Sequence, residues 1–148
     1  MPEITSEILI PAAPEKVYAV ARDIERFPEF LPDVESVVVR TGEGGRVVSE
    51  WVGVVRALGR KVKWEEEDLW DDAARRCDFR AIKGDWDRYE GSWTFQPDPG
   101  GCLVRLRLGF EFNVPLIGPL IRGLLKKLVQ KNSDEMLRGL KARVLGER

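Results

Sequence analysis

The stretch from Cys102 to Asn113, CLVRLRLGFEFN, shows the clearest alternation of apolar and polar residues in the chain. Its apolar side chains share one face of an extended strand: Val104, Leu106, Leu108, Phe110 and Phe112. Its polar side chains share the other face: Arg105, Arg107, Glu111 and Asn113. A period of two residues is typical of a strand that is buried on one side and wet on the other. The stretch therefore predicts an antiparallel sheet with one face in the core.

The same period extends back from this stretch as far as Val34. We expect six strands in succession, at 34–41, 46–57, 60–70, 75–83, 86–96 and 102–113. Short segments rich in Gly, Asp and Pro separate them, which indicates turns between antiparallel neighbours. An earlier alternating run, 3–10, supplies a further strand.

Two short helical segments are expected between the first strand and the other six. One begins at Pro14 or Glu15, because proline suits the first turn of a helix and glutamate is favourable there. The other is a short helical turn within 26–32, where two prolines prevent a longer helix.

A long helix is expected after the last strand, from Pro119 or Leu120 to about Leu145. Its apolar stripe is wide, which favours a helix that lies along the sheet. We therefore predict an α+β fold in which a curved antiparallel sheet of about seven strands wraps around the C-terminal helix. No linker or repeat interrupts the pattern, so residues 1–148 are expected to form a single domain.

The composition narrows the possible chemistry. The chain has 148 residues, 43% of them hydrophobic and 33% charged, and a net charge of −1. Histidine is absent, which excludes histidine-dependent hydrolase triads and histidine-bearing zinc sites. We expect no cofactor and no metal, and the balanced charge gives no indication of DNA binding. Cys77 and Cys102 are expected to be reduced core residues.

The N-terminus and the hydropathy pattern bear on location. The first residues, MPEITSE, are acidic and short of apolar residues, unlike a secretory signal. No stretch approaches the ~18 uninterrupted apolar residues of a membrane span. The expected location is the cytoplasm.

Three stretches, read together with this order of elements, resemble the START/SRPBCC superfamily. They are 10–18 (IPAAPEKVY), 27–32 (FPEFLP) followed by 34–37 (VESV), and 89–95 (YEGSWTF). Within the superfamily the chain looks closest to the polyketide cyclase/dehydrase and coenzyme-Q-binding START branch. The resemblance implies the helix-grip fold and a deep apolar cavity between the sheet and the long helix. Members bind lipids, quinones, polyketides or plant-hormone-like molecules, and some are cyclases or aromatases.

The inward faces of the expected strands and helix supply candidate ligand-binding residues. These are Val62, Trp64, Phe79, Tyr89, Trp93, Phe95, Leu106, Leu108, Phe110, Ile121, Leu124, Leu125 and Leu128. The alternative is that these side chains only pack against one another. The five tryptophans favour a cavity, because each indole N–H needs a partner and such groups orient a mostly apolar ligand.

Glu66 and Asp68 are the polar residues whose position decides the chemistry. If Val62 and Trp64 point inward, strict alternation sends both carboxyl groups inward, where they would repel and form an acid/base pair. We favour the alternative, in which a bulge or a frayed strand end places them in water. Tyr89 is the preferred polar residue of the cavity wall.

Other polar residues have less specific interpretations. Asn132 can bind a ligand oxygen or a local backbone group. Arg88 and Glu90 share a strand face, which favours a solvated ion pair over catalysis. Basic residues gather on the outer side of the long helix: Arg122, Lys126, Lys127, Lys131, Arg138 and Lys141. A solvated face is the favoured interpretation, and contact with anionic lipid or RNA is the alternative.

Three functions stay open. The first is binding of a small hydrophobic molecule, such as a quinone, isoprenoid, lipid or aromatic polyketide. The second is a cofactor-independent polyketide cyclase or dehydrase, which the absence of histidine disfavours. The third is a protein-interaction module, as in the ribosome-associated antitoxin relatives of this branch. A dry apolar pocket favours the first, an inward Glu66 or Asp68 beside Tyr89 favours the second, and a core without a cavity leaves the third.

Overall fold

The computed structural model describes residues 2–56, 59–112 and 119–146, and for 119–122 it describes the helical backbone alone. Seven strands and three helical segments follow one another along the chain. They are β1 (Glu3–Ile10), α1 (Pro14–Arg22), the 3₁₀ helix η1 (Ile24–Glu29), β2 (Val34–Glu43), β3 (Arg46–Val55), β4 (Arg60–Asp71), β5 (Arg76–Gly84), β6 (Arg88–Asp98), β7 (Gly101–Glu111) and α2 (Pro119–Leu145).

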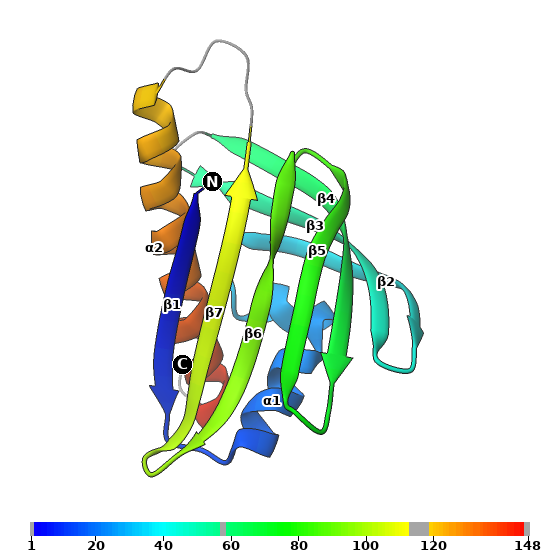
Figure 1. Ribbon diagram of the computed structural model, residues 1–148, viewed down its shortest axis with the longest axis vertical. Coiled ribbons are helices and arrows are strands. Elements are labelled where there is room, and N and C mark those ends of the chain that lie inside the picture. The colour runs from blue at the N-terminus through cyan, green and yellow to red at the C-terminus, as the bar shows by residue number, and fades with distance from the viewer. Residues whose placement is uncertain (1, 57–58, 113–118, 147–148) are drawn as a thin grey trace.

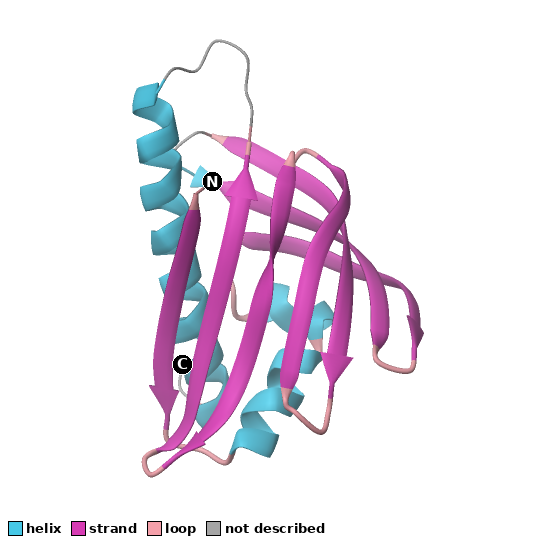
Figure 2. Ribbon diagram, in the orientation of Figure 1, coloured by secondary structure: helices cyan, strands magenta, loops and turns pink. Residues whose placement is uncertain are grey.

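The seven strands form one antiparallel sheet in the order β1-β7-β6-β5-β4-β3-β2. The sheet curves around α2, and α1 and η1 lie at one end of the molecule (Figures 1 and 2). The predicted α+β architecture, with two short helices after the first strand, is confirmed. Strand boundaries differ from the prediction by up to two residues, and the main consequence is that Trp86 lies in the loop before β6 instead of within the strand.

The strand register aligns the apolar residues across the concave face. Between β6 and β7, Tyr89 pairs with Phe110 and Trp93 pairs with Leu106. Leu106 and Phe110 are buried, as the alternation predicts. Each pair therefore contributes two side chains to the same layer of the core.

The two halves of α2 pack differently. In the C-terminal half, Leu137, Leu140 and Val144 are buried in the core. Gly139 lets this half approach closely, because an added Cβ would lie 2.6 Å from the Leu31 side chain. In the N-terminal half, Leu125 and Val129 are only half-buried. The helix is therefore held tightly at one end and stands further from the sheet at the other.

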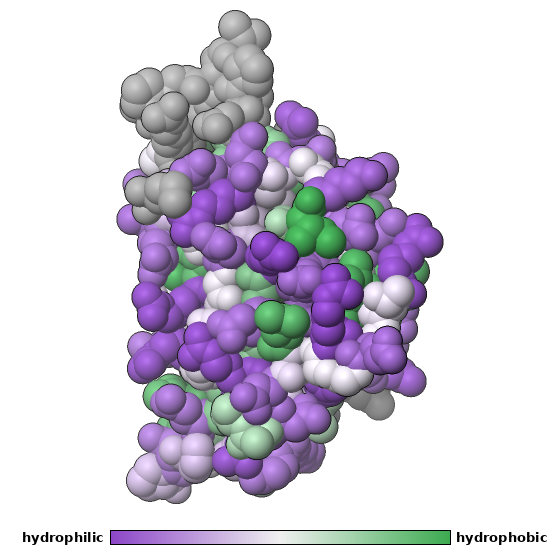
Figure 3. All heavy atoms as spheres, turned by 45° about the vertical axis from the view of Figure 1, so that its right-hand side comes forward, coloured by the Kyte–Doolittle hydropathy of each residue, from purple (hydrophilic) through white to green (hydrophobic). Residues whose placement is uncertain are grey.

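The convex face of the sheet is covered by charged side chains. Arg107 pairs with Glu3 at 3.0 Å, and Glu67 receives Arg46 at 2.8 Å and Arg80 at 3.1 Å. The face shown in Figure 3 is mainly hydrophilic, with apolar side chains as separate spots. The wet outer face that the alternation predicts is confirmed.

Two further expectations concern the described part of the chain. Cys77 and Cys102 are free and buried, as predicted. No helix among the described residues is both long enough and apolar enough to cross a membrane.

Gly91 marks a close approach of β6 to β7 and gives a test of the fold. An added Cβ there would lie 1.8 Å from the carbonyl oxygen of Arg107 and 3.0 Å from the ring of Phe79. The backbone cannot move aside without breaking the ladder, so Gly91→Ala is expected to lower the free energy of unfolding by roughly 2–3 kcal/mol. Urea unfolding followed by tryptophan fluorescence measures this change.

Gly123→Ala is the matched control, because an added Cβ there meets nothing within 4 Å on an exposed part of α2. Alanine favours helix, so this variant is expected to gain up to about 1 kcal/mol. Equal effects of the two substitutions would contradict the close approach at Gly91.

Candidate ligand-binding cavity

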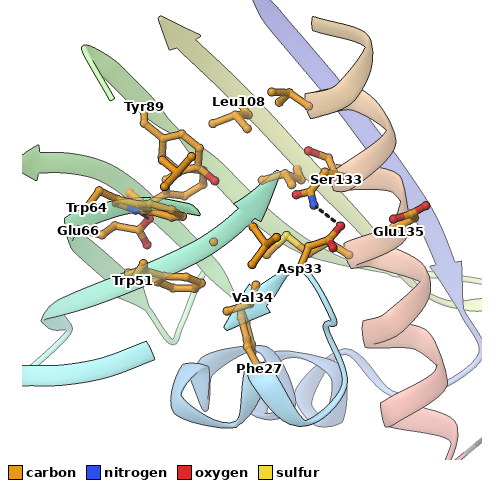
Figure 4. Close-up of a pocket in the computed structure, with 18 of the residues that line it drawn as sticks. Phe27, Asp33, Val34, Trp51, Trp64, Glu66, Tyr89, Leu108, Ser133 and Glu135 are labelled. Carbon is orange, nitrogen blue, oxygen red and sulfur yellow. Dashed lines mark hydrogen bonds between the residues drawn. The ribbon is translucent and has the colours of Figure 1, made fainter. Parts of the chain in front are cut away.

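A cavity of about 320 Å³ lies between the concave face of the sheet and the N-terminal half of α2. Its size is at the lower end of the range for small-molecule sites, about 300–1,000 Å³. All five tryptophans of the chain line it: Trp51, Trp64, Trp70, Trp86 and Trp93. Figure 4 shows Trp51, Trp64, Glu66 and Tyr89 on the strand side, facing α2.

The helix and the floor complete the walls. From α2 come Leu125, Leu128, Val129, Asn132, Ser133 and Met136, spaced along one helical face. Ala21, Ile24 and Phe27 supply the floor from α1 and η1. The cavity exists because the tight packing of α2 is confined to its other half.

Most of the predicted wall residues line this cavity. They are Val62, Trp64, Phe79, Tyr89, Trp93, Leu106, Leu108, Leu125 and Leu128. Val129 and Met136 also line it, because they follow Leu125 by four and eleven residues and so share its face of α2.

Three predicted wall residues lie elsewhere, and one is outside the described residues. Phe95 is fully buried between Tyr18 and Trp93, with ring centroids 5.5 and 6.2 Å away. Phe110 packs edge-on against Trp86 inside the core. Leu124 is 45% exposed, because the stripe on α2 is narrower at this point than the sequence suggested. The side chain of Ile121 is not described.

Glu66 and Asp68 line the cavity, so the favoured prediction that they lie in water is wrong. They are 5% and 2% exposed. The pairing of β3 with β4 is regular throughout, so β4 alternates without interruption. The irregularity lies in β5, where the register moves from Lys83 to Ala81 and skips the exposed Ile82. A bulge is present as anticipated, but the neighbouring strand carries it.

The two carboxyl groups perturb each other. Burial raises the pKa of Glu66 well above its ordinary value, and the charge of Asp68 and a hydrogen bond with it raise that pKa further. Burial also raises the pKa of Asp68, and the hydrogen bond with Glu66 opposes that rise. The pKa of Glu66 is therefore raised more than that of Asp68, and Asp68 is the first of the two to ionise as the pH rises.

Tyr89 and Cys77 stay protonated beside this pair. Burial, followed by the charges of Glu66 and Asp68, raises the pKa of the Tyr89 hydroxyl. Burial and the same two charges raise the pKa of the Cys77 thiol. Because the thiolate is the reactive form of cysteine, Cys77 is not suited to act as a nucleophile.

Four of the five indole N–H groups fall into two sets. Trp51 Nε1 donates to Ser49 Oγ at 2.9 Å, and Trp64 Nε1 donates to Glu66 Oε1 at 3.1 Å. The buried Nε1 atoms of Trp70 and Trp86 have no hydrogen-bond partner in the structure. The cavity wall thus keeps two donors that the described residues do not satisfy.

Asp33 joins three elements beside the cavity, and the sequence did not point to it. Its carboxylate accepts from Arg56 Nε at 2.7 Å and from Asn132 Nδ2 at 3.0 Å. The second bond is the dashed line that ends at Asp33 in Figure 4. Asn132 therefore bonds a neighbouring side chain while it lines the cavity. These contacts connect the approach to β2, the end of β3 and α2, so only the folded chain brings them together.

The remaining polar candidates are on the surface. Arg88 and Glu90 form an ion pair of 2.6 Å along β6. Lys126, Lys127 and Lys131 are exposed on α2, and Lys131 reaches the edge of the cavity. Among the described residues, no three or more His, Cys, Asp or Glu side chains lie where they could hold a metal ion.

Comparison with known proteins agrees with this geometry. The family model described as polyketide cyclase / dehydrase and lipid transport matches residues 1–145. The crystal structure of TTHA0849 from Thermus thermophilus is 46% identical, with 98% of each chain covered and a TM-score of 0.93. The ZhuI aromatase/cyclase from Streptomyces sp. R1128 is 17% identical, covers 97% of this chain and 93% of its own, and has a TM-score of 0.88; that likeness concerns the fold.

The curated relatives are named for association with the ribosome, not for a cyclase or lipid-transport activity. The ribosome association toxin RatA of Vibrio cholerae is 29% identical over 119 residues, which are 79% of this chain and 80% of RatA. RatA of Escherichia coli is 25% identical over 135 residues, which are 88% of this chain and 84% of RatA. These relatives are named toxins, so the expected label of antitoxin is wrong.

The superfamily resemblance of the three sequence stretches is therefore confirmed by the match over nearly the whole chain. The chain belongs to the polyketide cyclase/dehydrase and lipid transport family of the START/SRPBCC superfamily.

Proposed function

We propose that this protein binds a small, mostly apolar molecule in the cavity between the sheet and α2, for storage, transport or presentation. The observation that carries the proposal is the 320 Å³ cavity walled by all five tryptophans. Quinones, isoprenoids, lipids and aromatic polyketides are the ligand classes that suit such a wall. The predicted wall residues that line the cavity are the proposed contacts.

The stacked and tilted rings favour a flat, apolar part of the ligand. Trp51 and Trp64 stack with an interplanar angle of 11° and centroids 5.8 Å apart, and Tyr89 lies 5.2 Å beyond Trp64. Aromatic faces of this size provide a large apolar contact area at low cost in conformational entropy. The first direct test is native mass spectrometry of the purified protein, with an organic extract of the denatured protein analysed beside it.

A fluorescent probe tests the location of the ligand. N-Phenyl-1-naphthylamine, an apolar dye that brightens on leaving water, is expected to bind the wild type. Leu128→Trp places a larger side chain into the cavity wall and is expected to weaken dye binding at least about tenfold, since filling the cavity removes the contact area. Dye titrations of each variant give the dissociation constants.

Leu124→Trp is the matched control for Leu128→Trp. It makes the same substitution one turn earlier on α2, at a side chain that is 45% exposed and does not line the cavity. Dye binding by this variant should match the wild type. Equal loss in both variants, or no binding by a folded wild type together with a ligand-free native mass, would contradict the proposal.

The buried carboxyl groups generate a prediction about pH. Since the pKa of Glu66 is raised in the folded state, the unfolded chain loses this proton at a lower pH than the folded chain. The free energy of unfolding therefore falls as pH rises from the ordinary carboxyl pKa to the raised one. Glu66→Gln cannot titrate and escapes this fall.

Thermal unfolding measures the effect. At pH 8, Glu66→Gln is expected to be more stable than the wild type by at least about 1 kcal/mol, or roughly 3 °C in Tm for a chain of this size. At pH 4 the two should be nearly equal. Glu65→Gln, on the other face of the same strand, is the control and should follow the wild type. A Glu66→Gln variant that is less stable at both pH values would show that the carboxyl group serves the fold instead of the site.

Catalysis is the second candidate function, and one observation favours it. Glu66 and Asp68 lie beside Tyr89 in the cavity, which is the arrangement expected of a cyclase or dehydrase. In a dehydration, the carboxylate would take a proton from a carbon next to a carbonyl, and the acid would protonate the leaving hydroxyl, which departs as water. Conversion of the β-hydroxyketone 4-hydroxy-4-phenylbutan-2-one to its enone, lost in Asp68→Asn and kept in Glu65→Gln, would favour catalysis.

Protein interaction is the third candidate. Only the names of the RatA relatives favour it. A core without a cavity would have left it as the main candidate, and the structure has a cavity. Co-sedimentation of the protein with ribosomes, with and without the dye bound, separates this function from ligand binding.

A further inference from the structure

The cavity contains buried polar atoms that the described residues leave without a hydrogen bond. They are Asp68 Oδ1, Trp70 Nε1 and Trp86 Nε1. Asp68 is 2% exposed and Trp70 is 8% exposed, and both line the cavity. An unpaired polar atom in an apolar interior is costly, so these atoms indicate where the polar groups of a bound molecule belong.

The carboxyl pair leaves one oxygen without a donor. Glu66 Oε1 accepts the Trp64 N–H at 3.1 Å, while Asp68 Oδ1 is buried without a hydrogen-bond partner among the described residues. A proton shared between the two side chains can serve only one of the two Asp68 oxygens. The other oxygen therefore needs a donor, because a carboxylate can only accept.

Two of the indole N–H donors on the cavity wall already have acceptors. Trp51 N–H is held by Ser49, and Trp64 N–H is held by Glu66. Trp70 follows Asp68 by two residues on the same face of β4, so its side chain lies alongside Asp68 and is packed against Tyr18 and Arg22. No described side chain donates to Asp68 Oδ1, the Tyr89 hydroxyl included, so a donor is expected from a molecule within the cavity.

The rings around Asp68 define the body of that donor molecule. Asp68 pairs with Phe79 across β4 and β5, and the Phe79 ring lies 5.7 Å from Tyr89. Tyr89 in turn lies 5.0 Å from Trp86 and 5.2 Å from Trp64. Asp68 is thus the acceptor within a wall of aromatic faces, which suits a flat ring with a polar substituent.

We infer that Asp68 makes the cavity selective for aromatic ligands that carry a hydroxyl group, which donates to Asp68, over ligands whose oxygens can only accept. This inference rests on the proposed binding function and deepens it. Among the proposed ligand classes it favours aromatic polyketides with phenolic hydroxyl groups and the reduced, hydroxyl-bearing form of a quinone. The oxidised quinone presents carbonyl oxygens, which would face the carboxylate without a proton between them.

Charge makes the selectivity large. A hydrogen bond from a neutral hydroxyl to a carboxylate is stronger than one between neutral groups, and the dry surroundings strengthen it further. A matched ether or carbonyl compound leaves Asp68 unpaired and adds oxygen–oxygen repulsion. We expect a hydroxyl compound to bind at least about tenfold more tightly than its methyl ether.

The experiment compares 4-phenylphenol with 4-methoxybiphenyl as competitors of N-phenyl-1-naphthylamine at pH 7. The two compounds share the aromatic body and differ in the donor. In the wild type, 4-phenylphenol is expected to displace the dye at a concentration at least about tenfold lower. This comparison needs no variant, so it does not depend on whether a substituted chain folds.

Two variants assign the preference to one side chain. Asp68→Leu replaces the carboxyl group by an apolar group of similar shape and should abolish the difference between the two compounds by weakening 4-phenylphenol. Asp68→Asn keeps an acceptor oxygen without the charge and should give an intermediate preference. Glu65→Gln, on the outer face of β4, should leave the preference unchanged.

The outcomes distinguish failure of the hydroxyl preference from failure of ligand binding itself. Equal displacement by both compounds from the wild type would overturn the inference and leave ligand binding intact. A preference that survives in Asp68→Leu would also overturn it, because another group would then be the acceptor. Failure of the dye and of both compounds to bind a folded wild type would overturn the proposed function itself.

Discussion

The pleat of β4 is the constraint on which the site depends. Its uninterrupted alternation places Val62, Glu66, Asp68 and Trp70 on one buried face. A shift by one residue would move the carboxyl groups to water but would expose Val62 and Trp70 at the same time. The large apolar residues fix the register, and the carboxyl groups are carried inward with them.

Burying two carboxyl groups side by side is costly, and the structure shows how the cost is limited. The raised pKa of Glu66 favours its neutral form, which reduces the charge of the pair, and the Trp64 indole N–H donates to Glu66 Oε1 at 3.1 Å. The bulge at Ile82 lies on β5, so the pairing of β4 with β3 stays regular. Polar groups retained in a core at such a cost are characteristic of functional sites. The aromatic wall also retains costly buried polar groups, since the indole N–H groups of Trp70 and Trp86 have no hydrogen-bond partner among the described residues.

Local pattern was sufficient to predict the fold from the sequence, because each element carries its own periodicity. The strand 3–10 was placed to the residue, and the long helix, expected to end at about Leu145, ends at Leu145. The apolar cavity wall followed from the same alternation, since inward positions on β4, β5, β6 and β7 could be counted along each strand. Trp86 lies outside this count, because it reaches the cavity from a loop.

The errors arose where two distant segments decide the outcome. The position of Glu66 and Asp68 depended on which of two paired strands carries a bulge, and a single strand does not reveal that. Asp33 bonds Arg56, which is 23 positions away in the sequence, and Asn132, which is 99 positions away. Leu124 is exposed because of the way α2 packs on the sheet. Such features are decided by how two elements pack or pair in the folded chain, and the sequence of one element does not specify them.

The unequal packing of α2 links the fold to the site. The half around Leu137 and Leu140 contributes to the core, so the half around Leu125 and Val129 can stand away from the sheet without loss of the helix. Asn132 and Asp33 connect that looser half to the strands through one hydrogen bond of 3.0 Å. A molecule in the cavity would give the loose half the apolar contacts that it lacks and would give Asp68 a donor. A bound molecule would therefore contact the same face of α2 that is only half-buried at Leu125 and Val129.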